Sequence, residues 1–300
     1  MSLDAKGRKP IDTPARSKPE RSALAPGLYL VATPIGNIED ITLRALRVLG
    51  AADLVACEDT RVSQKLLARY DIATQRVPYH EHNAEAMRPK LLARLDAGAR
   101  IALISDAGTP LVSDPGFKLV REAVARGIAV TVVPGASAPL AALILSGLPC
   151  ERFCFAGFLP PRSEARRRAL AELRAVPATL VFFESAPRLA ASLADMAAIL
   201  GARPAAVARE LTKLYEEVRR APLADLAAHY RDAGPPKGEL VVLVGPPAEE
   251  EASAASLDEA LAAALETLSV KDATAAVAGA LGLPRRAVYA RALALAGRAP

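Results

Sequence analysis

The segment IALISDAGTP, residues 101–110, joins an apolar run to a small loop that contains both glycine and proline. The same arrangement occurs in LYLVA followed by TPIGN (28–37) and in VTVV followed by PGASA (130–138). Runs of β-branched and aliphatic residues are typical of strands that are buried on both faces of a sheet. Ligands of open α/β sheets bind just beyond the carboxyl ends of such strands. The three loops therefore predict one ligand site at one edge of an α/β sheet.

Apolar runs alternate with amphipathic segments along most of the chain, which predicts two α/β domains. The stretch 211–220 lacks helical periodicity, so we expect an extended or hairpin element there and a mixed second sheet. The tail of the chain resembles a helix-turn-helix module, although a small bundle that only packs on the main body fits equally well. The predicted parts are a flexible basic tail (1–26), an N-terminal α/β domain (27–139), a C-terminal α/β domain (140–247), a linker (248–256) and a helical unit (257–300).

The amino-acid composition and net charge narrow the classes of protein to which this chain can belong. Hydrophobic residues make up 52% and charged residues 24% of the 300 residues, which is typical of a globular chain. The net charge of +5 is compatible with a polyanionic partner, while 4% aromatic residues make stacking platforms for single strands scarce. Three cysteines favour a reduced, cytoplasmic protein without a zinc site or other metal site, and the basic N-terminus lacks the apolar core of a secretory signal. We expect no membrane association, because prolines and glycines interrupt the longest uncharged stretch.

The strand-end loops lack the usual nucleotide-binding fingerprints. No GxGxxG follows the first strand and no GxxxxGK[ST] occurs, which argues against dinucleotide and nucleoside-triphosphate sites. The loops instead combine a rigid proline with a permissive glycine, so the backbone can approach a ligand closely. Asp106 can accept hydrogen bonds from a ribose diol or an amine, or attract a sulfonium. Alternatively, its carboxylate bonds the amide of Gly108 in a local turn.

Several longer motifs occur in an order that resembles one family. They are CEDTRVSQKLL (57–67), HEHN (80–83), SDAGTPLVSDPG (105–116), PGASA (134–138), FFES (182–185), ARELTKLYEE (208–217) and KGELVVLVG (237–245). This set resembles the RsmI family, the 16S rRNA (cytidine-2′-O)-methyltransferases of the tetrapyrrole methylase superfamily. The similarity runs from about Pro26 to Gly245, and the helical tail resembles the C-terminal domain of that family.

The resemblance implies two α/β domains of the tetrapyrrole methylase type, S-adenosyl-L-methionine in the cleft between them, and a homodimer. It implies 2′-O-methylation of a cytidine in small-subunit ribosomal RNA, either naked or in the assembled subunit. The cofactor-binding residues that it implies are Pro34, Gly36, Asp106, Gly108, Thr109, Pro110, Ser137, Ala138, Phe183, Glu184, Arg209 and Leu211.

The chain departs from the family where ESPHRL is usual, because it has Pro187 at the position of the histidine. That histidine cannot serve as a base in this chain. Two other histidines, His80 and His82, follow a short predicted strand, and either could accept a ribose proton near neutral pH. A structural role or a phosphate contact is the alternative for both. The catalytic candidates are His82, Lys213 and Glu58, the last two because they match family motifs.

RNA binding requires positive charge, and arginines are densest after Leu159-Pro160-Pro161. A solvated helix face would also explain such a run. The candidate RNA-binding residues are Arg61, Arg162, Arg166, Arg167, Arg168, Arg285 and Arg286.

Two other functions compete with methylation of ribosomal RNA. A methyltransferase of the precorrin type would share the fold, although the arginine run disfavours a small tetrapyrrole substrate. A ligand-sensing DNA-binding regulator would use the helical unit to bind DNA, but the weak net charge of that unit disfavours it.

Overall fold

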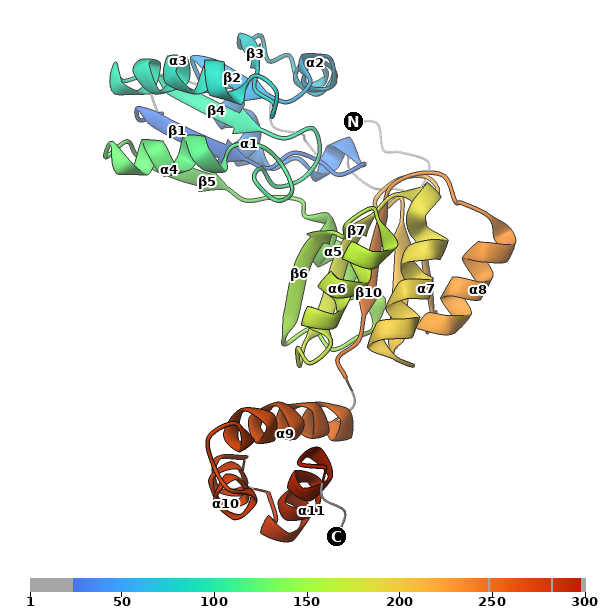
Figure 1. The fold of residues 1–300 in the computed structure, drawn as a ribbon. Helices are drawn as coiled ribbons and strands as arrows, with labels where there is room; N and C mark the ends of the chain where they lie inside the picture. Colours follow the sequence, from blue (N-terminus) through green and yellow to red (C-terminus); the bar gives the residue numbers. More distant parts are fainter. Residues whose placement is uncertain (1–23, 248, 282, 298–300) are drawn as a thin grey trace, which may run out of the picture. The chain divides into compact units, whose positions relative to one another are not determined.

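The computed structural model describes residues 24–247, 249–281 and 283–297 of the chain (Figure 1). The chain divides into two compact units between Ala136 and Ser137. Most of the predicted basic tail, residues 1–23, lies outside the described residues. Each unit is described by itself below.

The first unit contains a five-stranded parallel sheet with the strand order β3-β2-β4-β1-β5. The central strands are buried along most of their length, as the apolar runs predict. The strands are β1 (Gly27–Val31), β2 (Leu54–Cys57), β3 (Arg76–Pro78), β4 (Arg100–Ile104) and β5 (Val130–Val133).

Helices cover both faces of this sheet. Apolar residues of α1 and α2 pack on one face, around Leu49 and Leu67, and those of α3 and α4 pack on the other, around Leu92 and Leu119. The two aliphatic layers hold the sheet rigid, so the loops at its carboxyl edge have a fixed base. The elements are η2 (Ile38–Asp40), α1 (Leu43–Ala51), α2 (Thr60–Arg69), α3 (Ala84–Asp96) and α4 (Phe117–Ala125).

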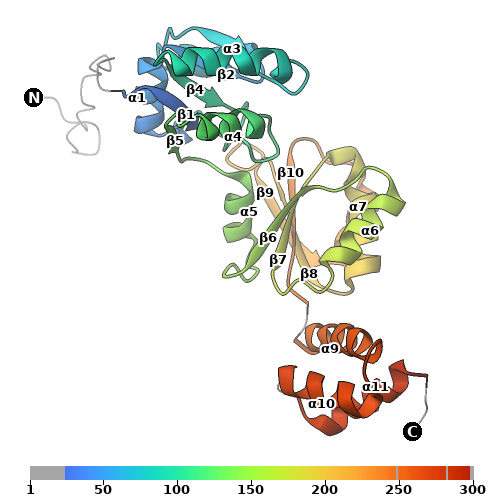
Figure 2. The same cartoon turned by 60° about the vertical axis from the view of Figure 1, so that its left-hand side comes forward.

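The second unit contains a mixed sheet with the order β6-β7-β10-β8-β9. Strand β10 is antiparallel to both β7 and β8, which confirms the mixed sheet that the sequence predicts. Helices α6, α7 and α8 cover one face, and α5 lies against the other (Figure 1 and Figure 2). The elements are α5 (Ala138–Ser146), β6 (Phe153–Phe158), α6 (Ser163–Leu173), β7 (Thr179–Glu184), η3 (Ala186–Arg188), α7 (Leu189–Leu200), β8 (Pro204–Arg209), β9 (Glu217–Pro222), α8 (Leu223–Ala233) and β10 (Leu240–Val244).

Two elements differ from the sequence-based expectation. Between β9 and β10, where the sequence predicts no regular element, the chain forms the helix α8, which buries Leu223, Leu226 and Tyr230 in the core. Its few apolar residues are diluted by alanine, so the periodicity is weak in the sequence although packing selects the helix. The predicted linker at 248–256 is also wrong over 249–256, because α9 (Glu249–Leu265) begins at Glu249.

Helices α9, α10 (Val270–Leu281) and α11 (Arg285–Leu295) share a small core of their own, which includes Leu261, Val277 and Val288. This agrees with the helical unit that the sequence predicts. Among the described residues, no helix has both the length and the apolar character that crossing a bilayer requires.

Candidate functional site

The carboxyl edge of the first sheet gathers the polar residues that the sequence analysis singled out. His80 follows β3, Glu58 follows β2 and Asp106 follows β4, in the spatial order of neighbouring strands. The loops that contain Thr33 and Pro134 follow β1 and β5 at the same edge. Parallel strands bring five loops together here, which is where ligands of such sheets bind.

Hydrogen bonds join three of these loops into one body. The amide of Thr33 donates to the carbonyl of Gly108 at 2.9 Å, and the amide of Gly108 donates back to Thr33 at 3.1 Å. The Ser105 hydroxyl donates to the carbonyl of Gly108 at 3.0 Å, and that of Thr109 donates to the carbonyl of Ala136 at 3.2 Å. The loops after β1, β4 and β5 are therefore held in one arrangement, whichever ligand they bind.

Two glycines allow the close approach of these loops. Gly108 has a φ of +81°, and a Cβ there would lie 3.2 Å from Cγ2 of Ile35. A Cβ on Gly135 would lie 3.0 Å from the Cβ of Ala32. At both positions a side chain would push one loop away from its neighbour.

Asp106 links two loops and does not form the local turn considered as an alternative. The amide of Gly108 donates to Thr33, so it is not available to the Asp106 carboxylate. Oδ1 of Asp106 instead accepts a hydrogen bond of 3.0 Å from the amide of Asp59. Burial raises the pKa of Asp106. Oδ2 has no hydrogen-bond partner among the described residues, so it can accept from a ligand.

Two further carboxylates, those of Glu58 and Asp114, lie close together at the same edge, with Tyr79 and Ser105 beside them. Burial raises the pKa of Glu58, and the nearby charge of Asp106 raises it further. Burial and the neighbouring Glu58 raise the pKa of Asp114 to about 6. A site with several carboxylates in partial burial favours cationic ligands or groups that carry a proton.

The two histidines of the loop after β3 have different surroundings. His82 is exposed, whereas Nδ1 of His80 is buried without a hydrogen-bond partner among the described residues. Asn83 fixes the loop by accepting from the His80 amide at 2.9 Å and donating to the Pro78 carbonyl at 3.0 Å. The charge of His80 also acts on Glu58. His80 is therefore the less exposed of the two histidines, and its ring lies 6.0 Å from that of His82.

The second sheet brings its predicted cofactor residues to one edge as well. Strands β7 and β8 both run antiparallel to β10, and Leu240 of β10 is in register with Glu184 and with Arg209. Phe183 packs against Phe155 with ring centroids 5.0 Å apart. Ser137 caps α5 and Ala138 begins it.

Three of the predicted residues at this edge are engaged within the fold. Glu184 is 3% exposed, its Oε1 accepts from the Ser185 amide at 2.7 Å, and its Oε2 accepts from Ser192. The Glu184 carboxylate is therefore not available to a ligand. Arg209 pairs with Glu217 at 3.2 Å, and Leu211 is buried.

Lys213, one of the three catalytic candidates, is held by two carboxylates. Its ammonium lies 2.8 Å from Oε1 of Glu210 and 2.7 Å from Oε2 of Glu239. Burial alone would lower the pKa of Lys213, but the hydrogen bonds to these two carboxylates outweigh it and raise the pKa. The protonated lysine braces the loop between β8 and β9, where Glu210 and Thr212 have positive φ values.

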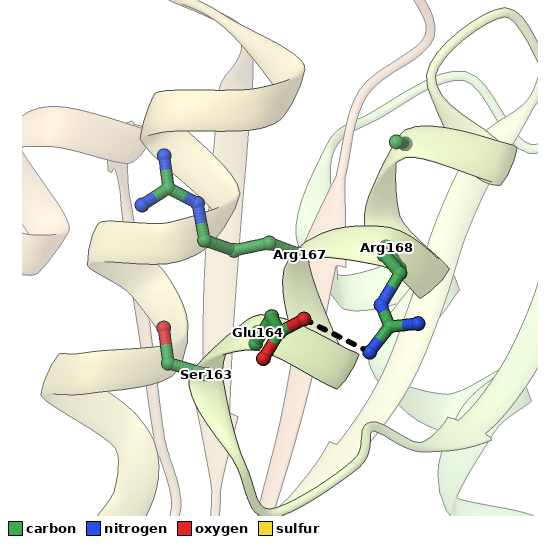
Figure 3. A pocket seen from close by; sticks show the side chains of 5 residues that line it. Ser163, Glu164, Arg167 and Arg168 are labelled. Carbon is green, nitrogen blue, oxygen red and sulfur yellow. Dashed lines mark hydrogen bonds and ion pairs between the residues drawn. The ribbon is translucent and has the colours of Figure 1, made fainter.

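The arginines at the start of α6 and along it are of two kinds, one buried and the others exposed. Arg166 is 4% exposed and pairs with Asp195, with 2.7 Å between Nη2 and Oδ2, so its prediction as an RNA contact is wrong. Arg162 and Arg167 are exposed, and Arg168 pairs with Glu164 on the surface. Figure 3 shows the Arg167 and Arg168 side chains leaving α6 in different directions. Both residues line an open hollow of about 510 Å³.

The other predicted RNA contacts lie on exposed helix starts. Arg61 is exposed, but its guanidinium lies 2.7 Å from Asp59, whose pKa falls to about 2 because Arg61 donates to it. Arg285 and Arg286 are exposed in the first turn of α11. Arg61, Arg285 and Arg286 therefore remain candidate RNA contacts.

Sequence reasoning did not identify Asp195 and Arg188. Asp195 lies inside the otherwise apolar helix LAASLADMAAIL, and a lone carboxylate there requires a buried partner, so this signal was present. Arg188 follows Pro187 in η3, and its guanidinium donates to the carbonyl of Leu159 at 2.6 Å. No local pattern in the sequence indicates the contact between Arg188 and the carbonyl of Leu159.

Comparison with known proteins agrees with this architecture. Residues 27–227 match the model of the Tetrapyrrole (Corrin/Porphyrin) Methylases, and residues 251–296 match the RsmI C-terminal HTH domain. The chain is 55% identical to "Ribosomal RNA small subunit methyltransferase I" of Mesorhizobium japonicum over 91% of this chain and 93% of that protein. It is 46% identical to the protein of the same name from Escherichia coli O157:H7, over 89% and 94% of the two chains.

A solved structure shares the fold of the two α/β units. The uroporphyrin-III C-methyl transferase from Thermus thermophilus, complexed with S-adenyl homocysteine, aligns with a TM-score of 0.53 and 23% identity over 72% of this chain and 96% of that chain. From the family model and the relatives of near-complete coverage, the chain belongs to the tetrapyrrole methylases and, within them, to the family of ribosomal RNA small subunit methyltransferase I.

Proposed function

We propose that this protein methylates the 2′-hydroxyl of a cytidine in small-subunit ribosomal RNA, with S-adenosyl-L-methionine as the methyl donor. The observation that carries the proposal is its 55% identity, over nearly the whole chain, to a protein named for ribosomal RNA small subunit methylation. The substrate is either the RNA itself or the assembled small subunit, in the cytoplasm, and the enzyme acts as a homodimer.

The residues at the carboxyl edge of the first sheet fit the cofactor. An adenosine carries a ribose diol that donates hydrogen bonds, and Asp106 has one carboxylate oxygen without a partner among the described residues. Gly108 and Gly135 allow a close backbone approach, and Pro34 and Pro110 limit the freedom of their loops. The proposed cofactor-binding residues are Pro34, Gly36, Asp106, Gly108, Thr109, Pro110, Ser137 and Ala138, with Phe183, Arg209 and Leu211 from the second unit.

S-adenosyl-L-methionine supplies a methyl group on a sulfonium, which is already activated for in-line displacement. The protein must therefore align the ribose hydroxyl and accept its proton. Alignment can supply about 7 to 11 kcal/mol of the barrier, whereas a general base typically contributes about 10² to 10⁴ in rate. The rigid loops described above favour alignment as the larger contribution.

A methylation assay tests the proposed function directly. Purified protein with S-adenosyl-L-methionine and 30S subunits, or naked 16S RNA, should transfer a methyl group to a single cytidine ribose, which mass spectrometry of nuclease fragments would locate. Methyl transfer to a precorrin but not to either RNA substrate would reverse the assignment in favour of a tetrapyrrole methyltransferase. Specific duplex DNA binding without any methyl transfer would favour a regulator.

We propose His80, beside Glu58, as the group that accepts the ribose proton. Its Nδ1 is buried next to the acidic edge, whereas His82 is exposed on the same loop. His80→Ala should lower kcat for RNA methylation by about a hundredfold, the lower end of what a general base contributes. His82→Ala, the matched control, should leave kcat within about twofold. Equal kcat values for both variants would exclude His80 as the base.

A further inference from the structure

The loop Leu159–Arg162 ends at the exposed Arg162, and the side chains of two other arginines, Arg166 and Arg188, bind its carbonyls. This loop enters α6, and the exposed Arg162 and Arg167 lie at its end and on the helix that follows. Pro160 and Pro161 have no amide N–H, so this stretch cannot be held by amide donors of its own and depends on hydrogen bonds to its carbonyls.

Two guanidinium groups supply those donors. Nη2 of Arg188 donates to the carbonyl of Leu159 at 2.6 Å and to that of Pro160 at 3.2 Å. Nη1 of Arg166 donates to the carbonyl of Pro161 at 3.1 Å. Three successive carbonyls of one loop are thus bound by side chains from η3 and α6, which fixes the path of the loop.

Each of these arginines is balanced by a buried carboxylate. Arg166 donates to Oδ2 of Asp195 at 2.8 Å through Nε, and Ser163 at the start of α6 donates to the same oxygen at 2.9 Å. Nε of Arg188 lies 3.4 Å from Oε1 of Glu184. Asp195 on α7 therefore orients the Arg166 guanidinium, and Glu184 on β7 supplies a counter-charge near Arg188. The two guanidinium groups in turn bind the carbonyls of the loop.

The exposed side of the same segment is suited to a polyanion. Among the described residues, Arg162 and Arg167 have no ion pair; Arg162 lies at the N-cap position of α6, where helix amides add positive potential, and Arg167 lies one turn further along the helix. The proposed substrate is a ribose-phosphate chain, so phosphate contacts would supply a large share of binding. Arginines on a fixed loop lose less conformational entropy on binding than arginines on a mobile one.

We infer that Arg166 and Arg188 are positioning residues, which hold the Leu159–Arg162 loop so that Arg162 and Arg167 contact phosphates of the RNA substrate. This inference rests on the proposed function. It assigns to the second unit a role in substrate binding that is separate from cofactor binding. It also divides one arginine-rich stretch into residues that brace the fold and residues that contact RNA.

The test compares three variants in the methylation assay. Arg162→Ala with Arg167→Ala should raise KM for RNA about tenfold and reduce the salt dependence of RNA binding by about 1.5 in the log–log slope. Arg166→Met with Asp195→Leu replaces the ion pair by apolar residues of similar size, which leaves folding near neutral. We expect this double variant to raise KM for RNA about tenfold as well, without a change in kcat or in affinity for S-adenosyl-L-methionine.

Arg188→Lys is the conservative counterpart, because it keeps the charge next to Glu184 but cannot bridge two carbonyls. We expect a smaller rise in KM, about threefold, with an unchanged melting temperature. An unchanged KM in folded Arg166→Met/Asp195→Leu and Arg188→Lys proteins would overturn the positioning role. If Arg166→Met/Asp195→Leu folds poorly, the outcome for Arg188→Lys decides alone. Failure of the wild-type protein to methylate any RNA would contradict the proposed function instead.

Discussion

Asp106→Ala is expected to abolish binding of S-adenosyl-L-methionine, with a loss of at least about a thousandfold in affinity. The carboxylate makes one hydrogen bond to the amide of Asp59 and has a second oxygen available to the ligand. Removal of a partly buried, charged hydrogen-bond partner costs about 4 kcal/mol, which corresponds to that change in Kd. Isothermal titration calorimetry with S-adenosyl-L-methionine measures it.

The matched control for this variant lies on the same sheet. Asp53→Ala also removes an aspartate from the first unit, but Asp53 precedes β2 at the amino edge, where it pairs with Arg100 at 2.6 Å. This variant should bind S-adenosyl-L-methionine as the wild type does. Circular dichroism should show the same helix content for both variants, because neither residue contributes apolar area to the core. Wild-type affinity in Asp106→Ala would exclude the proposed cofactor edge.

The parallel half of the fold was the part most open to prediction from the sequence. The apolar run IALI (101–104) is buried as β4 in a sheet covered on both faces. The run VTVV (130–133) instead forms the edge strand β5, in which Val132 is 54% exposed and only Val133 is buried, so the expectation of burial on both faces is wrong for this strand. Each run ends at a turn signal. Strand order was not predictable, because it depends on which loops cross which face. That order is what places the loops after β1, β4 and β5 side by side.

The candidate site was predictable where backbone chemistry decides it and less so where side chains choose partners. Gly108 and Asp106 stood out because few residues allow a tight loop or a polar strand end. Arg166 and Arg167 are neighbours with the same side chain, yet one is buried and the other exposed. Their difference depends on Asp195, 29 residues from Arg166, and the residues around the two arginines do not indicate which of them is its partner.

Lys213 is another residue whose contacts could not be predicted from the sequence. A lysine within a family motif suggested chemistry, but Glu210 and Glu239 hold its ammonium in the loop between β8 and β9. Glu239 lies on the far side of α8 in the sequence, so the pair depends on the antiparallel return of β10. Ion pairs that form only through the sheet topology could not be predicted from sequence motifs.

Asp195→Ala should destabilise the second unit by about 3 to 5 kcal/mol, the largest loss of stability that we expect from one substitution. The variant leaves the Arg166 guanidinium, 4% exposed, without its counter-charge and removes the acceptor of the Ser163 hydroxyl. Breaking a buried ion pair from one side has this cost because the remaining charge stays desolvated. Urea denaturation, with hydrogen exchange of the α6 and α7 amides, measures the loss.

Asp96→Ala removes a half-exposed pair with Arg126 and should cost less than about 1 kcal/mol, and Arg166→Met/Asp195→Leu should recover most of the stability. A loss for Asp195→Ala no greater than that for Asp96→Ala would contradict the structural role of the buried pair.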